Sequence, residues 1–172
     1  MLKLFGAVLV LFSGTMIGLF QANRFSERPR QIRDLLRALQ RLETEIGYGL
    51  TPLPDALKKM AQPVQPPTKS IWEELAHRMT EDSGLSAAQI WVQVVEQYWR
   101  RTSMKAAEKE VILQLGQNIG ISDREDQLKH IQLAKEQLRA EEDEAMQERD
   151  RYSKMWKTLG GLAGAFVVIL IF

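Results

Sequence analysis

The chain of 172 residues contains no cysteine, which excludes disulfide bonds and thiolate metal sites. Its 23 Lys and Arg nearly balance its 22 Asp and Glu, so it lacks the basic excess that is typical of nucleic-acid-binding proteins. No alternating apolar and polar pattern indicates β-strands. There is no Gly-x-Ser-x-Gly nucleophile motif, and the segment from Gly116 to Gly120 lacks the Lys of a phosphate-binding loop. We therefore expect a helical protein that is not an enzyme and binds no cofactor.

One short motif points to a metal. Glu74 and His77 have the E-x-x-H spacing of di-iron sites in helical bundles, but such a site requires a second copy of the motif and two further Glu. The other histidine, His130, has Gln127 three residues before it, so the second copy is missing. We interpret His77 as a residue of a helix surface or core edge, and a membrane-bound di-iron protein is the more distant alternative.

Two uncharged apolar stretches lie near the ends of the chain, from Leu4 to Phe20 and from Thr158 to Phe172. All 22 acidic residues, and every basic residue except Lys3, lie between them in residues 24–157. With the neutral residues that follow it, the first stretch extends from Leu4 to Asn23, which is 20 residues and about the length that crosses a bilayer. No small-residue cleavage site follows it, which favours a retained anchor over a signal peptide. The second reaches only about 22 Å as a helix, so we predict a short span, with a half-inserted anchor as the alternative.

The charges next to these stretches predict an orientation. Basic residues follow the first stretch and precede the second, namely Arg24, Arg28, Arg30, Arg33 and Arg37, then Arg149, Arg151, Lys154 and Lys157. Because positive charge is retained on the cytoplasmic side, we expect the central region in the cytoplasm and the chain in contact with membrane lipid. The predicted organisation is an N-terminal transmembrane helix (residues 1–23), a cytoplasmic domain (24–157) and a C-terminal transmembrane helix (158–172).

The central region is expected to be helical throughout. An apolar stripe at helical spacing consists of Ile32, Leu35, Leu36, Leu39, Leu42 and Ile46. A second helix is predicted from Thr51, as its cap, to about Met60. Capping boxes predict the starts of two more helices, one at Ser70 to Glu73 and one at Ser122 to Glu125. Between these two, helices are predicted from Ser86 to Trp99 and from about Ser103 to Asn118. The last helix meets no proline or glycine before Gly160, so it should continue into the membrane without a break. Trp72, Trp91 and Trp99 are interpreted as core residues. The predicted fold is an all-α, six-helix bundle flanked by two membrane helices.

The two helices next to the membrane carry opposite charge. Residues 24–41 contain six Arg against Glu27 and Asp34, and residues 136–150 contain seven acids against Arg139 and Arg149. Antiparallel neighbours would pair these blocks, and two separately solvated faces are the alternative. Together with the turn after the first helix, the blocks supply our candidate partner interface: Arg30, Arg33, Arg37, Arg41, Tyr48, Thr51, Glu141, Glu142 and Glu144.

Glycines recur four residues apart in both apolar stretches, at Gly14 and Gly18 and again at Gly160 and Gly164. Small residues at this spacing let membrane helices approach closely, so the two stretches are candidates for packing on each other or on partner helices. The alternative is that glycine is simply frequent in membrane helices.

Several runs of residues, in this order along the chain, resemble the stage III sporulation protein AB family of endospore-forming bacteria. They are Leu2 to Leu4, Glu27 to Arg33, Glu45 to Leu53, Gly116 to Gly120, Asp123 to Glu125 and Gln127 to Ile131. The resemblance spans essentially the whole chain, including both apolar stretches. The runs together identify the family, whereas no single run would suffice.

The resemblance implies a soluble domain similar to the six-helix cytoplasmic domain of the type II secretion F platform protein. It also implies a place in the channel complex that the mother cell builds around the forespore, in the mother-cell membrane. The expected partners are a stage III sporulation protein AA-type ATPase and other channel components. The implied function is a non-enzymatic platform that couples this ATPase to the complex; the alternative is a structural scaffold that self-assembles as a homo-oligomer.

Overall fold

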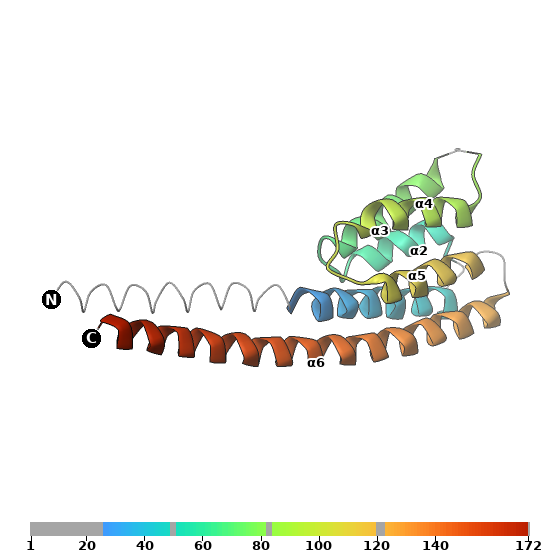
Figure 1. The fold of residues 1–172 in the computed structure, drawn as a ribbon. Coiled ribbons are helices and arrows are strands. Elements are labelled where there is room, and N and C mark those ends of the chain that lie inside the picture. Colours follow the sequence, from blue (N-terminus) through green and yellow to red (C-terminus); the bar gives the residue numbers. More distant parts are fainter. Residues whose placement is uncertain (1–25, 49–50, 82–83, 120–122, 172) are drawn as a thin grey trace. The chain divides into compact units, whose positions relative to one another are not determined.

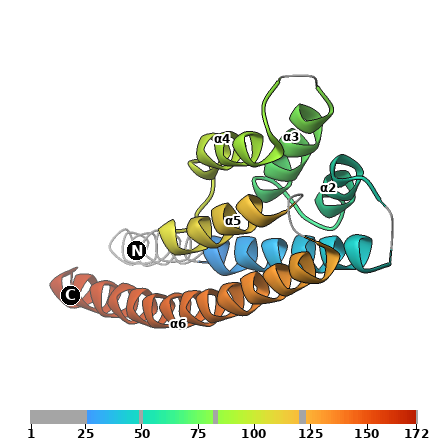
Figure 2. The same cartoon turned by 90° about the vertical axis from the view of Figure 1, so that its right-hand side faces the viewer.

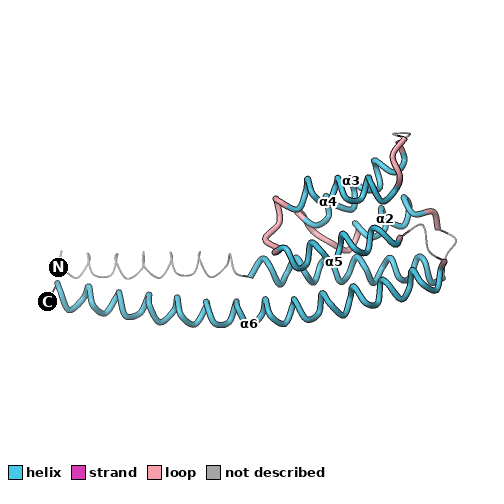
Figure 3. The backbone as a smooth tube through the Cα atoms, turned by 45° about the vertical axis from the view of Figure 1, so that its right-hand side comes forward, coloured by secondary structure: helices cyan, strands magenta, loops and turns pink. Residues whose placement is uncertain are grey.

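The computed structural model describes residues 26–48, 51–81, 84–119 and 123–171. Within these ranges the chain forms six helices, joined by loops and without strands (Figures 1 and 3). The helices are residues 26–48, α2 (Leu53–Ala61), α3 (Thr68–Thr80), α4 (Ala87–Trp99), α5 (Ala106–Asn118) and α6 (Arg124–Ile171). The prediction of an all-α helical bundle is confirmed.

The chain divides into two compact units. The larger unit, Arg30–Asp143, contains most of the 26–48 helix, all of α2 to α5 and the first part of α6. The described residues of the smaller unit are 26–29 and 144–171. Helix α6 has 48 residues, or about 72 Å at 1.5 Å per residue, and therefore contributes backbone to both units.

The core of the larger unit comes from the stripe of the 26–48 helix, from α2 to α5 and from Ile131, Ala134 and Leu138 of α6. Helices α2 to α5 each pack on the next along the chain (Figure 2). Of the predicted stripe, Ile32, Leu35, Leu39 and Leu42 are fully buried, and Leu36 and Ile46 are half-buried. Trp72 and Trp91 meet edge to face with ring centroids 5.9 Å apart, and Trp99 is also buried. The tryptophans are therefore core residues, as predicted.

Helices α4 and α5 approach closely at one point. The Trp91 indole Nε1 donates a hydrogen bond to the carbonyl of Ile112 at 2.9 Å. The ring then lies directly against Gly116, where a Cβ atom would be 2.1 Å from Trp91 Cδ1. Only glycine leaves room for the indole at this position.

Helix starts follow the prediction in one case and depart from it in another. A helix was predicted to open at Ser86, and α4 begins at the next residue. Ser86 and Gln89 form a capping box there, with Gln89 N donating to Ser86 Oγ at 3.3 Å and Ser86 N donating to Gln89 Oε1 at 2.9 Å. The prediction of a cap at Ser70 is wrong, because α3 begins at Thr68. The Ser70 N–H already donates to the Pro67 carbonyl in the turn before it.

Thr51 does not cap α2, contrary to the prediction. Pro52 occupies the cap position and its carbonyl accepts the N–H groups of Asp55 and Ala56. The Thr51 hydroxyl instead donates to Glu45 Oε2 at 3.0 Å, because this acid lies within reach at the end of the preceding helix. Helix α5 also starts later than predicted, at Ala106, since the Ser103 N–H is taken by Gln31 Oε1 at 2.7 Å.

Helix α6 is unbroken, as predicted, from Arg124 to Ile171. Ser122 lies outside the described residues, and Asp123 supplies the cap by accepting the N–H of Asp126 at 2.9 Å. The first apolar stretch, with Gly14 and Gly18, also lies outside the described residues, whereas Gly160 and Gly164 fall within α6. In the described part of the chain, no helix has an apolar stretch long enough to cross a membrane.

Candidate protein-docking site

The oppositely charged blocks of the 26–48 helix and α6 form ion pairs. In the larger unit, Arg33 Nε lies 2.5 Å from Glu142 Oε1, and the Glu142 side chain is 16% exposed. In the smaller unit, Arg28 is buried and its Nη1 lies 2.8 Å from Glu148 Oε2 and 3.7 Å from Glu144 Oε1. The predicted pairing between the blocks is therefore found, and Arg33 reaches it with a side chain that stays 45% exposed.

A further ion pair has the reverse polarity. Lys135 of α6 places its Nζ 2.6 Å from Glu43 Oε2 and 2.8 Å from Gln40 Oε1 of the 26–48 helix. The Lys135 and Glu43 side chains are only 11% and 19% exposed. Sequence reasoning missed this pair, because the charge blocks placed bases on the first helix and acids on the last. Its only sequence signal was a lone lysine on the apolar face of α6.

Of the other arginines of the candidate interface, Arg37 and Arg41 pair within their own helix and Arg30 reaches the loop after α2. Arg37 pairs with Asp34 at 3.1 Å and Arg41 with Glu45 at 2.9 Å, while Arg30 donates to Gln65 Oε1 at 3.4 Å. The Arg37 and Arg41 side chains remain 60% and 44% exposed. On α6, Glu141 is half-buried and Glu144 is exposed.

Glu45 ties the end of the 26–48 helix to the start of α2. Its carboxylate accepts hydrogen bonds from Lys59 Nζ at 2.5 Å and from the Thr51 hydroxyl at 3.0 Å. The hydrogen bond from Lys59 is the main cause that lowers the pKa of Glu45; desolvation opposes it, and Thr51 and the charges of Lys59 and Arg41 lower it further. The ionised carboxylate therefore holds together the two segments on either side of Tyr48.

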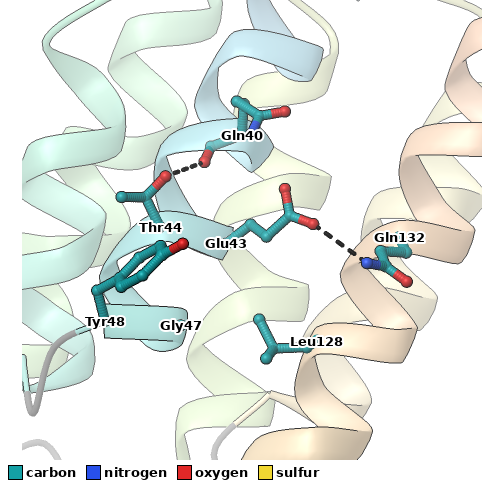
Figure 4. Close-up of a pocket in the computed structure, with 7 residues that line it drawn as sticks. All are labelled: Gln40, Glu43, Thr44, Gly47, Tyr48, Leu128 and Gln132. Atoms are coloured by element: carbon teal, nitrogen blue, oxygen red, sulfur yellow. Dashed lines mark hydrogen bonds between the residues drawn. The ribbon is translucent and has the colours of Figure 1, made fainter.

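Tyr48 stands at the rim of an open groove of about 440 Å³ between the 26–48 helix and α6 (Figure 4). The groove is lined by Gln40, Glu43, Thr44, Gly47, Tyr48, Leu128 and Gln132. Tyr48 is 93% exposed, which is unusual for a large aromatic side chain in a folded domain. Across the groove, Gln132 Nε2 lies 3.5 Å from Glu43 Oε1, and Thr44 bonds its own helix through the Gln40 carbonyl at 3.0 Å.

The chemistry of the groove suits protein recognition better than catalysis. Glu43, its only charged lining residue, is neutralised by Lys135. What faces the solvent is an aromatic ring, amide groups, a hydroxyl and the side of Leu128. Tyrosine is enriched in the energetically dominant positions of protein interfaces, because its ring buries much area at a small cost in side-chain entropy. A partner that covered Tyr48 would gain this burial.

The E-x-x-H motif is used differently. Glu74 accepts hydrogen bonds from Arg78 Nε at 2.6 Å and from the Tyr98 hydroxyl at 3.1 Å. Burial raises the pKa of Glu74, but these two hydrogen bonds outweigh it and the net shift is downward. His77 lies 3.3 Å from Glu81. Among the described residues, no group of three or more His, Cys, Asp and Glu is placed to hold a metal ion.

Comparison with known proteins gives consistent matches over nearly the whole chain. A model of the family described as stage III sporulation protein AB matches residues 3–172. The chain is 41% identical over 171 residues to stage III sporulation protein AB of Bacillus subtilis (strain 168), which covers 99% of either chain. It also resembles a solved structure of stage III sporulation protein AB, with a TM-score of 0.68 and 41% identity over 73% of this chain and 98% of that one.

Proposed function

Because the chain belongs to the stage III sporulation protein AB family, we propose that it is a non-enzymatic membrane platform, which couples a cytoplasmic ATPase to a sporulation channel complex. A role in sporulation follows from membership of the family. The finer parts of the proposal are the ATPase as partner, the mother-cell membrane facing the forespore as location, and membrane insertion through residues 1–23 and 158–172.

The observation that carries the coupling role is the course of α6. Leu128 and Gln132 of this helix line the groove at Tyr48, and the same helix continues without a break to Ile171, in the C-terminal apolar stretch. A continuous helix resists bending and compression better than a jointed chain. A force applied where the partner docks would therefore be passed along α6 toward the membrane.

The groove supports an ATPase or another folded protein as the partner, because it offers an exposed aromatic ring within a polar rim. The residues around the groove are held in place before any partner binds. Glu45 connects the end of the 26–48 helix to Lys59 and Thr51. The ion pair of Lys135 with Glu43 connects the two helices that line the groove. A pre-organised surface loses little conformational entropy on binding, which favours a defined docking mode.

The proposal is tested by binding of a purified stage III sporulation protein AA-type ATPase to the full-length chain in lipid nanodiscs. Replacing Tyr48→Ser should weaken binding about tenfold or more, the effect of losing one dominant interface aromatic. Val92→Ser is the matched control, since Val92 is a 37% exposed apolar residue on α4 and its loss should leave the affinity unchanged.

Equal binding by the two variants would contradict docking at Tyr48. No binding by the wild-type chain would favour the second candidate, a structural scaffold that assembles with copies of itself. That candidate has its own support in the exposed apolar side chains of α6.

A further inference from the structure

A second groove, here called the α5–α6 groove, lies between these two helices within the larger unit. It has a volume of about 410 Å³, and no Asp, Glu, Lys or Arg is among the described residues that line it. Four lining residues carry amide groups, namely Gln114, Gln117, Asn118 and Gln137. The others are Val111, Leu115, His130, Leu133 and Ala134. The groove therefore combines apolar and amide surface without a permanent charge.

The two grooves contain the two most exposed large apolar side chains in the described part of the larger unit. Tyr48, which is 93% exposed, lines the first groove, and Leu133, which is 53% exposed, lines the α5–α6 groove. Leu85 and Val92 are less exposed, at 41% and 37%, and line neither groove. An exposed apolar side chain beside polar groups in a concave surface is typical of a protein-binding site.

Helix α6 is the wall that the two grooves share. Its residues Leu128 and Gln132 line the groove at Tyr48, whereas Leu133 and three further residues of the helix line the α5–α6 groove. With 3.6 residues per turn these two sets lie on different sides of α6, and the exposed Lys129 and Glu136 lie on the strip between them. Because Gln132 and Leu133 are consecutive, a protein that covers the first groove reaches the second across this strip.

The size of the first groove favours a partner that extends beyond it. A stable protein interface covers about 800 Å² on each partner and roughly 20–30 residues. Seven residues line the groove at Tyr48 and nine line the α5–α6 groove. Neither set alone approaches that size, whereas the two sets together with the strip between them come close to it.

We propose that the protein which docks at Tyr48 also straddles α6 and inserts an uncharged segment into the α5–α6 groove, with Leu133 as its second apolar anchor. This mode of binding rests on the docking at Tyr48 proposed above and adds the chemistry of the partner. A charged side chain in the groove would lose its hydration without an opposite charge among the lining residues to compensate it. An apolar side chain packed on Leu133, with peptide groups that hydrogen-bond to the amides, satisfies the groove.

The test measures binding of the purified stage III sporulation protein AA-type ATPase to the full-length chain in lipid nanodiscs. Leu133→Ser removes the second anchor, and Leu85→Ser is its matched control, because Leu85 is exposed but lines neither groove. Gln137→Glu places a charge in the α5–α6 groove with little change of shape, and Gln93→Glu at an exposed position of α4 is its control. We expect Leu133→Ser and Gln137→Glu each to weaken binding about fivefold or more, and both controls to bind as the wild-type chain does.

Full affinity in Leu133→Ser and Gln137→Glu, with weakened binding by Tyr48→Ser, would overturn this mode of binding and leave docking at Tyr48 in place. A loss that each control shares equally would overturn it too, since the effect would not belong to the groove. No binding by the wild-type chain would overturn it together with the docking at Tyr48. All the substituted residues are exposed, so the thermal unfolding midpoint of each variant should equal that of the wild-type chain and exclude misfolding as the cause of a loss.

Discussion

Two helix contacts in the larger unit are held by different physics. Helices α4 and α5 meet through shape, with the Trp91 indole against the bare backbone of Gly116 and the hydrogen bond to Ile112 beneath it. The 26–48 helix and α6 meet with charge at the edges of their apolar stripe, through Lys135 with Glu43 and Arg33 with Glu142. The first contact leaves no room for a side chain larger than glycine, whereas the second adds ion pairs to a stripe of fully buried apolar residues that includes Leu35, Leu39 and Leu138.

The two contacts serve different parts of the bundle. The contact of α4 with α5 lies within the core and is set by the shape of the Trp91 indole. The contact of the 26–48 helix with α6 carries the groove at Tyr48, and α6 continues from there to the C-terminal apolar stretch. The platform role that we propose would use the second contact for docking.

The largest expected effect breaks the shape-held contact. Gly116→Ala places a methyl group where Trp91 Cδ1 is 2.1 Å away, so the indole must leave its site, and we expect a loss of about 2–4 kcal/mol in the free energy of unfolding. Gly47→Ala is the matched control: its Cβ would lie 4.0 Å from Leu128 Cδ2, an ordinary contact, and the better helix former should be neutral or add about 0.5–1 kcal/mol. Chemical denaturation of the two variants measures both free energies of unfolding. Equal losses would show that Gly116 is no more tightly packed than Gly47.

A smaller effect is expected at the charge-held contact. Lys135→Met leaves Glu43 sheltered and without its lysine, so we expect a loss of about 2 kcal/mol, most of which Lys135→Met combined with Glu43→Leu should restore. Lys129→Met removes an exposed pair with Asp126 and should cost less than about 0.5 kcal/mol. A double-mutant cycle without coupling between Lys135 and Glu43 would show that the pair does not hold the helices together.

The smallest effect concerns pH at the link between the 26–48 helix and α2. The pKa of Glu45 is lowered in the folded protein, chiefly by the hydrogen bond from Lys59. Its contribution to stability is therefore present above the usual glutamate pKa of about 4.3 and is lost as the pH falls through the lowered value. The thermal midpoint of the wild-type chain should fall more steeply below about pH 5 than that of Glu45→Gln. Parallel curves for the two proteins would show that this carboxylate does not stabilise the fold.

Much of the fold could be predicted from the sequence, because it depends on local patterns. The apolar stripe from Ile32 to Leu42, the capping box at Ser86 and the unbroken α6 are all visible as spacing along the chain. The pairing of opposite charges between the first and last helices was also predictable, since blocks of opposite sign on antiparallel neighbours attract.

The remaining features depend on which residues meet in space. Ser70 and Thr51 are residue types that commonly cap helices. Ser70 lies inside α3, which begins at Thr68, and the Thr51 hydroxyl donates to Glu45 instead of capping α2. The groove could not be predicted beyond Tyr48, because Leu128 and Gln132 come to it from a helix distant in sequence.

Labelling in the groove beside Tyr48 tests the platform role most directly. With Thr44→Cys as the only cysteine in the full-length chain, the rate of reaction with a membrane-impermeant maleimide is measured on vesicles that display the bundle outward. Val92→Cys on α4 serves as the control. If the ATPase docks at the groove, saturating ATPase should slow the labelling of Thr44→Cys strongly and leave that of Val92→Cys unchanged. An unchanged rate at Thr44→Cys in the presence of ATPase would contradict the docking site and the coupling that we propose through α6.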